Sequence, residues 1–187
     1  MPRPNWFFAF PIDGAFVLDL PPLPPNFRRV HPEDVHLTLA FLGGVAQAAA
    51  HDALGALDAQ LLVAPLSAIE VSLAEVVRMG GSRRSYSALS ALLDEGRAEA
   101  TAHLTSLRDR LTEAASGRRE QRAPKPHVSI ARPRTRASDA DREAGLSWAA
   151  QLSLRGVRAR LDRIALYTWS EARRDRLFQI VAERRLT

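Results

Sequence analysis

The sequence predicts an α+β fold built on antiparallel strands, and three observations support this class. Strand-like and helix-like segments follow one another in a mixed order, without the regular alternation of a doubly wound parallel sheet. The stretch 79–84 (MGGSRR) is a turn between two strand-like runs, as in a β-hairpin. Two strand segments, 36–41 and 127–132, resemble each other in sequence, which predicts two similar lobes.

The first half of the chain contains five predicted elements. Residues 5–12 (NWFFAFPI) are aromatic and apolar, and the strand ends before Asp13-Gly14. Four prolines make 21–27 a rigid extended connection, because proline is excluded from helix interiors. Strands are expected at 35–42, 66–77 and 85–92, and an amphipathic helix at 46–63 because Leu54, Leu57 and Leu61 have helical spacing.

The second half begins with the longest predicted helix, 95–115, which is followed by a charged loop at 117–126. A strand at 127–132 follows, then a polar loop at 134–141. A short helix is expected at 141–150, and strands at 152–158, 160–169 and 176–182. The 187 residues are therefore interpreted as one bilobal domain, 1–187, with lobes of roughly 90 residues each.

Composition excludes several classes of protein. The chain has no cysteine, so disulfides, iron–sulfur clusters and cysteine nucleophiles are excluded. No apolar run approaches the roughly 18 residues of a membrane span, and the N-terminus lacks a signal-peptide pattern. We therefore expect a soluble, cytoplasmic protein that does not contact membranes.

Charge is distributed unevenly along the chain. Residues 1–93 carry six arginines against eight acidic residues, whereas residues 94–187 carry nineteen arginines and Lys125 against thirteen acidic residues. An excess of this kind favours a polyanionic partner. The alternative is arginine-rich codon usage, since Lys125 is the only lysine.

The internal repeat carries the candidate chemistry. His36-Leu-Thr38-Leu-Ala and His127-Val-Ser129-Ile-Ala share the order histidine, aliphatic, hydroxyl, aliphatic, alanine. Alternation along a strand places each histidine and its hydroxyl on one face and the aliphatic residues on the other. One imidazole can then act as a base and the other as an acid in phosphoryl transfer, while the hydroxyls and Arg132 hold phosphate oxygens.

The two motifs resemble those of the two-histidine (2H) phosphoesterase superfamily, and their surroundings, HLTLAFLGGV at 36–45 and PHVSIAR at 126–132, are similar to the RNA 2′,3′-cyclic phosphodiesterases, also called 2′-5′ RNA ligases. WFFAF at 6–10 and IALYTWS at 164–170 extend the resemblance over nearly the whole chain. The resemblance implies a bilobal fold with the active cleft between two antiparallel sheets.

The resemblance also implies metal-independent hydrolysis of RNA 2′,3′-cyclic phosphate ends to a 2′-phosphate, without a cofactor, and a reverse ligation that forms a 2′-5′ bond. His36 would be the general acid and His127 the general base, with exchanged roles as the alternative. Thr38, Ser129 and Arg132 would bind the phosphate. Because the cleft is made within one chain, a monomer is expected.

The sequence leaves alternatives for the kind of site, the substrate and the function. A metal site is disfavoured because no carboxylate accompanies either histidine on its face. A different cyclic phosphate, such as a cyclic nucleotide or an ADP-ribose cyclic phosphate, is an alternative substrate. A non-catalytic RNA-binding module is an alternative function.

Two further groups are weaker candidates for binding RNA. Phe41 occupies the motif position equivalent to Arg132 and is the best candidate to stack on a base. The loop residues Arg118, Arg119, Arg122 and Lys125 are candidates to steer the RNA backbone, although a merely solvated charged loop explains them equally well.

Overall fold

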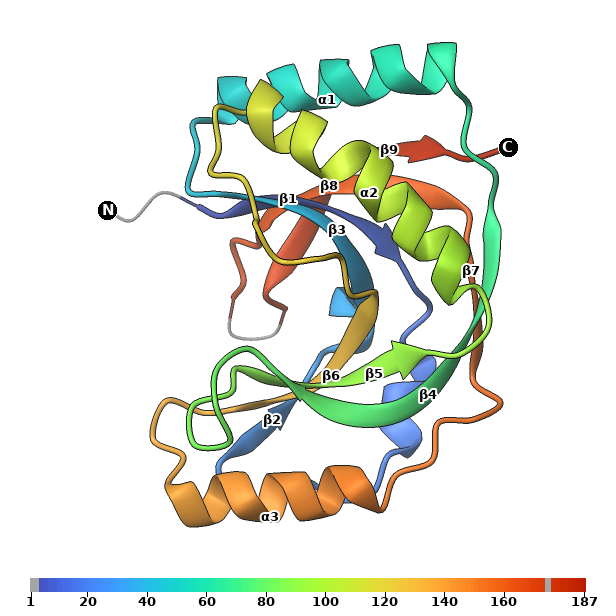
Figure 1. Cartoon of the computed structure of the whole chain (residues 1–187). Coiled ribbons are helices and arrows are strands. Elements are labelled where there is room, and N and C mark those ends of the chain that lie inside the picture. The colour runs from blue at the N-terminus through green and yellow to red at the C-terminus, as the bar shows by residue number, and fades with distance from the viewer. Residues whose placement is uncertain (1–3, 174–175) are drawn as a thin grey trace.

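A computed structural model describes residues 4–173 and 176–187. In these residues nine strands form one antiparallel sheet in the order β7-β4-β5-β6-β3-β1-β8-β9, and β2 pairs with β6 off this path (Figure 1). The strands are β1 (Trp6–Pro11), β2 (Phe27–Arg29), β3 (His36–Gly43), β4 (Ile69–Met79), β5 (Ala88–Leu93), β6 (His127–Pro133), β7 (Arg158–Leu161), β8 (Arg163–Trp169) and β9 (Phe178–Arg185). The helices are α1 (Gln47–Val63), α2 (Arg97–Ala114) and α3 (Asp139–Ala150), with short 3₁₀ turns at Ala15–Asp19 and Pro32–Asp34. The predicted α+β class is confirmed.

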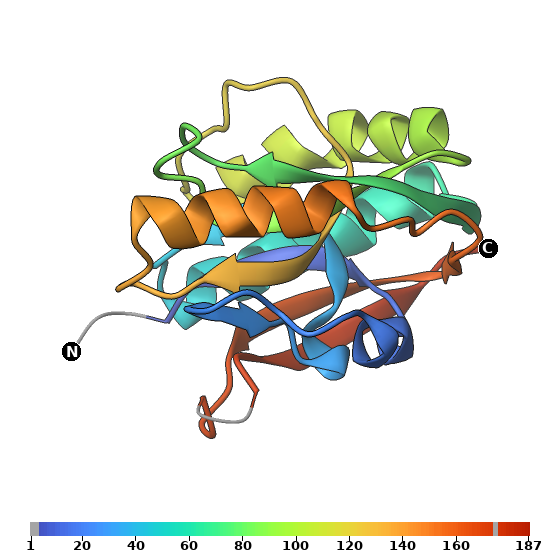
Figure 2. The same ribbon diagram turned by 90° about the horizontal axis from the view of Figure 1, so that it is seen from below.

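The sheet has two halves, each covered by helices on its outer side. Helix α2 packs on β3 and on α1. The two helices together cover the half formed by β3, β1, β8 and β9 (Figure 1). Helix α3 packs on β4 and β5 in the other half, as the view from below shows (Figure 2). Segments from both ends of the chain share one half, since β8 pairs with β1.

The two motif strands join the halves. β3 and β6 are antiparallel neighbours, and Leu37 of β3 lies opposite Val128 of β6. The resemblance implied an active cleft between two antiparallel sheets, whereas β3 and β6 lie side by side in one sheet. The ladder between them is short, with Leu37 and Val128 as its register pair, and the main hydrophobic core contains residues of both halves.

The core accounts for the alternation in both motifs. Leu37, Leu39, Val128 and Ile130 are at most 2% exposed and belong to the main hydrophobic core. A second, smaller cluster of Phe7, Ala9, Ala165 and Tyr167 lies apart from it. Phe7 and Ala9 alternate with the core residues Phe8 and Phe10 of β1, so the smaller cluster lies on the opposite face of the sheet.

Three predicted elements are corrected by the structure. The strand expected at 152–158 is mostly a loop, because Val157 N–H donates to Leu154 in a turn that needs Gly156 at φ +97°. The continuous strand expected at 160–169 is two strands separated by Asp162, and they pair with β4 and β1 in different halves of the sheet. The Pro-rich connection ends in a short strand, β2, that was not expected.

Helix α3 starts earlier than the expected residue 141. Ser138 forms a capping box with Asp141, in which each side chain accepts a backbone N–H from the other residue. The cap satisfies free N–H groups of the first turn, so the helix begins at Asp139. No helix among residues 4–173 and 176–187 is both long and apolar enough to cross a membrane.

Candidate active site

The two motifs place four polar side chains together on one face of the sheet. Because Leu37 is the partner of Val128 in antiparallel register, His36 lies towards Ser129, and Thr38 lies towards His127. Residues directly opposite in such a pair have Cα atoms roughly 4.5–5.5 Å apart. The sheet therefore brings together two histidines that are 91 positions apart in the chain.

Both imidazoles are held by the same hydrogen bond. His36 Nδ1 lies 2.6 Å from the carbonyl oxygen of Asp34, and His127 Nδ1 lies 2.7 Å from that of Lys125, in each case two residues before the histidine. A carbonyl oxygen only accepts, so Nδ1 carries the proton in both rings. Among residues 4–173 and 176–187, Nε2 of neither ring has a hydrogen-bond partner, so it can exchange a proton with a ligand.

A β-bulge repeats at the same position of both motifs. The register of β3 against β1 shifts after Thr38, and the register of β6 against β5 shifts after Ser129, so that Leu39 and Ile130 are left unpaired. An extra residue reverses the alternation that follows it. Phe41 and Arg132 therefore lie on the same face as the motif histidines, which the uninterrupted strand pattern would not give.

Burial and nearby positive charge lower the pKa of both histidines. Burial lowers the pKa of His36 to about 4, and the positive charges of Arg132 and His127 act in the same direction against the opposing hydrogen bond to Asp34. Burial is also the main cause that lowers the pKa of His127, which is half-buried. With no anion bound, His36 is an unprotonated base near pH 7.

Aromatic rings surround His36. Its ring centroid lies 4.9 Å from that of Phe7, 5.5 Å from Tyr167 and 5.8 Å from Phe178. These rings account for the desolvation of the imidazole. They also restrict its rotation, so that Nε2 keeps a fixed direction.

Asp34 was not identified from the sequence, although its main-chain oxygen holds His36. Its main-chain oxygen accepts from the imidazole, and its carboxylate, only 2% exposed, accepts backbone N–H groups of Leu177 and Phe178 at 2.7 and 3.1 Å. The carboxylate thus ties the start of β9 to the strand that carries His36. Since Asp34 is one of many carboxylates in the sequence, no motif distinguishes it.

A pocket of about 340 Å³ opens over this face and is lined by His36, Thr38 and Arg132. Phe41, 57% exposed, lines it together with Trp169 and Arg173, whose guanidinium lies 4.0 Å from the indole centroid. His127 and Ser129 lie on the neighbouring strand outside the pocket lining. The pocket therefore joins proton-transfer groups, a cation and aromatic surfaces.

Ser129 has a partner that the sequence did not suggest. Its hydroxyl lies 3.1 Å from that of Ser90, a fully buried residue at the opposite position of β5. A serine hydroxyl rotates more freely than that of threonine. The bond to Ser90 restricts this rotation in the absence of the methyl group.

The charged loop at 117–126 is only partly available to RNA. Arg119 pairs with Glu113, and Arg122 pairs with Glu120 at 2.6 Å. Arg118 and Lys125 have no ion pair within the described part of the chain. None of the four lines the pocket, and Lys125 contacts the motif through its carbonyl group.

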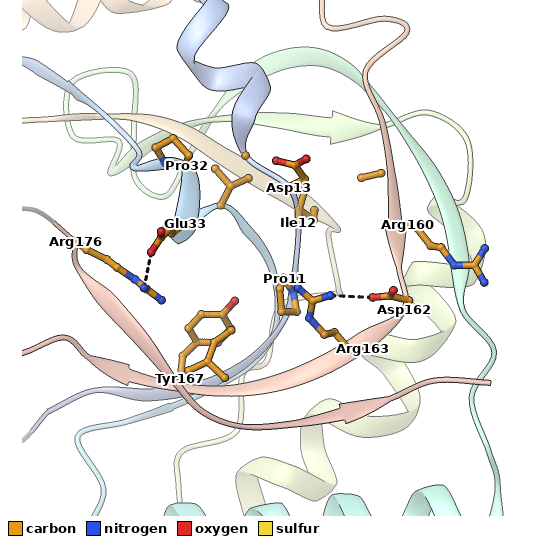
Figure 3. A pocket seen from close by; sticks show the side chains of 14 residues that line it. Pro11, Ile12, Asp13, Pro32, Glu33, Arg160, Asp162, Arg163, Tyr167 and Arg176 are labelled. Carbon is orange, nitrogen blue, oxygen red and sulfur yellow. Dashed lines mark hydrogen bonds and ion pairs between the residues drawn. The ribbon is translucent and has the colours of Figure 1, made fainter.

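The largest described pocket, about 510 Å³, lies elsewhere and contains neither motif histidine. Tyr167 forms part of its wall, and two of its arginines pair with carboxylates that also line it (Figure 3). Arg176 contacts Glu33, and Arg163 lies 3.4 Å from Asp162. This pocket thus offers few unpaired charges to a ligand.

Comparisons with known proteins agree with the fold and with the family that the sequence resembles. The family model described as the 2′-5′ RNA ligase superfamily matches residues 22–173. Among solved structures, that of Escherichia coli LigT complexed with 3′-AMP has 19% identity and a TM-score of 0.69, with 99% of each chain covered. A structure described as a phosphoesterase has 20% identity and a TM-score of 0.70, covering 100% of this chain and 99% of the other. Usb1 of Kluyveromyces marxianus has 12% identity and a TM-score of 0.53, covering 87% and 92%. No curated protein matches.

Proposed function

Because the chain belongs to the 2′-5′ RNA ligase superfamily, we propose that it hydrolyses RNA 2′,3′-cyclic phosphate ends to 2′-phosphates. The observation that carries this proposal is the pair of histidines on adjoining strands, each with Nδ1 bound to a carbonyl oxygen and Nε2 free. Two positioned imidazoles supply the base and the acid that such a displacement requires.

The reaction is written with His127 as the base and His36 as the acid. Nε2 of His127 removes a proton from water as the water oxygen bonds to phosphorus. The bond from phosphorus to the 3′ oxygen breaks, and Nε2–H of His36 protonates that oxygen. Thr38, Ser129 and Arg132 hold the non-bridging oxygens, whose charge the guanidinium neutralises through its planar fork.

The low pKa of His36 places a condition on its role as the acid. Without a ligand the imidazole is neutral, so it must gain its proton in the substrate complex. A phosphate anion beside the ring favours the imidazolium form and raises its pKa. Substrate binding thus favours protonation of His36, which can then act as the acid.

Hydrolysis of a nucleoside 2′,3′-cyclic phosphate and of a short RNA with a cyclic end tests the proposal. We expect both to yield a 2′-phosphate in the presence of a chelator, because imidazoles and hydroxyls replace a metal ion. Replacement of His36 or His127 by alanine is expected to lower kcat by about 10²–10⁴-fold. His51→Ala, a change of an exposed histidine in α1, is the matched control.

The remaining outcomes separate the alternatives. Full activity of His127→Ala would refute the mechanism. A 3′-phosphate product would show that the bond to the 2′ oxygen breaks, and the roles of acid and base would then be exchanged between the two histidines. Binding of RNA that is unaffected by both substitutions, without turnover, would identify a non-catalytic RNA-binding module. Turnover of only a non-RNA cyclic phosphate would assign the alternative substrate class.

A further inference from the structure

Two arginines lie directly opposite each other beside the candidate active site. Arg28 of β2 is the register partner of Arg132 of β6, so both side chains lie on the same face. Like charges at such positions destabilise a sheet. Within the described part of the chain, neither guanidinium has a carboxylate within 4.0 Å.

This pair differs from the arginines in the largest pocket. There Arg160, Arg163 and Arg176 each contact a carboxylate, two of them within the pocket itself (Figure 3). Burial lowers the pKa of Arg132, the nearby charge of Arg28 lowers it further, and the more distant carboxylate of Asp34 opposes them. In the described residues the arginine pair therefore has no direct ion pair, unlike the arginines of the other pocket.

The arginine pair borders a second pocket next to the site. This pocket, about 210 Å³, is lined by Arg28, Arg132, Arg134 and Arg173. Arg28, Arg132 and Arg173 also line the pocket that contains His36, so the two spaces adjoin. An anion in the second pocket would therefore lie next to a phosphate that reacts in the first pocket.

The other polar groups of the second pocket are already engaged. Both oxygens of Asp34 accept backbone N–H groups of Leu177 and Phe178. His31 accepts the N–H of Glu33 through Nδ1. Arg29 also lines the pocket, but its guanidinium donates to the carbonyl oxygens of Leu18, Leu20 and Pro21. The other four arginines thus provide the hydrogen-bond donors there, and donors of this charge and shape bind phosphate oxygens.

We propose that Arg28, with Arg132 and Arg173, binds a second phosphate group of the substrate beside the reacting cyclic phosphate. This inference rests on the proposed function and narrows its substrate to a molecule with two phosphates. In RNA the second group is the phosphodiester on the 5′ side of the terminal nucleotide. In a mononucleotide it is a 5′-phosphate.

Three substrates test the proposal and distinguish these sources. They are a nucleoside 2′,3′-cyclic phosphate, its 5′-phosphorylated form, and a dinucleotide that ends in the cyclic phosphate. We expect Arg28→Gln to lower kcat/KM for the second or third by about 10- to 100-fold relative to the first. An effect on the dinucleotide alone assigns the RNA backbone, and an effect on the 5′-phosphorylated nucleotide assigns a terminal phosphate.

Two further variants control for charge and folding. Arg28→Lys should recover part of the preference, since it keeps the charge without the planar fork. Arg155→Gln removes an exposed arginine from the turn after α3 and should leave all three values unchanged. Because Arg28→Gln relieves a like-charge contact, its thermal stability should equal or exceed that of the wild type.

The proposal is overturned if Arg28→Gln changes kcat/KM for all three substrates by the same factor. It is also overturned if the variant loses stability and activity together, because Arg28 would then be structural. If the wild type hydrolyses none of the three substrates, the proposed function itself is refuted. The two ideas therefore fail in different measurements.

Discussion

His36 is buried as a neutral imidazole, and this predicts a specific loss of stability in acid. The folded-state pKa of His36 is about 4, against about 6.5 for the unfolded chain. The unfolded chain therefore binds the proton first as the pH falls below 6.5. Stability is complete above this pH and declines until the folded state also takes up a proton near pH 4.

The magnitude follows from the same two values. One pKa unit corresponds to about 1.4 kcal/mol, so the whole difference is worth about 3 kcal/mol. Between about pH 7.5 and about pH 4.5, we expect His36 alone to remove about 2–3 kcal/mol of unfolding free energy. This is a large share of the unfolding free energy of a typical domain, which is roughly 5–15 kcal/mol.

Urea unfolding at the two pH values measures this contribution. His36→Asn removes the titrating group while its amide N–H remains close to the position of Nδ1. The variant has its own cost at every pH, so the quantity compared is the change in unfolding free energy between the two pH values. That change should be about 2–3 kcal/mol smaller in the variant than in the wild type.

The same substitution at His51, which is exposed, controls for loss of a histidine. If His36→Asn loses as much stability in acid as the wild type, the imidazole is not held neutral and the reasoning is wrong. NMR titration of the His36 ring with inorganic phosphate tests the second step. The pKa should rise on phosphate binding, and an unchanged value would remove His36 from the role of acid.

Three other changes test the surroundings of the site. Asp34→Asn should cost about 2 kcal/mol or more in urea unfolding, and should lower kcat, because a buried carboxylate that accepts two N–H groups is lost. Phe41→Ala should raise KM for nucleotides by about 5- to 100-fold with unchanged thermal stability, because this exposed ring offers a stacking surface; an unchanged KM would exclude stacking. Neutralising Arg118 and Lys125 together should reduce the salt dependence of RNA binding more than neutralising the ion-paired Arg119, and equal slopes would show that the loop does not steer RNA.

The fold class and most elements could be predicted because their signals are local. Aliphatic alternation and turn residues identified β1, β3 and β6 within one or two residues. Strand pairing is not local, which is why the segment 160–169 was interpreted as one strand. Asp162 is an ordinary polar residue in the sequence, and only the positions of β4 and β1 on opposite sides of the sheet require a break there.

The candidate site divides in the same way. The histidines and hydroxyls repeat along the chain, so a pattern identifies them and predicts a shared face. Ser90, Asp34 and Arg28 act through contacts with residues distant in sequence or through a buried environment. No spacing rule distinguishes these three from other serines, aspartates and arginines.

The sequence by itself determined that two short strands each present a histidine and a hydroxyl beside an aliphatic face, because side chains alternate along a strand. It also indicated the family, and the family model matches residues 22–173. Only the tertiary structure decided that these strands are neighbours, that bulges turn Phe41 and Arg132 to the same face, and that Arg28 lies opposite Arg132. Register, burial and electrostatic coupling depend on which segments meet in space, and that is settled by packing of the whole sheet.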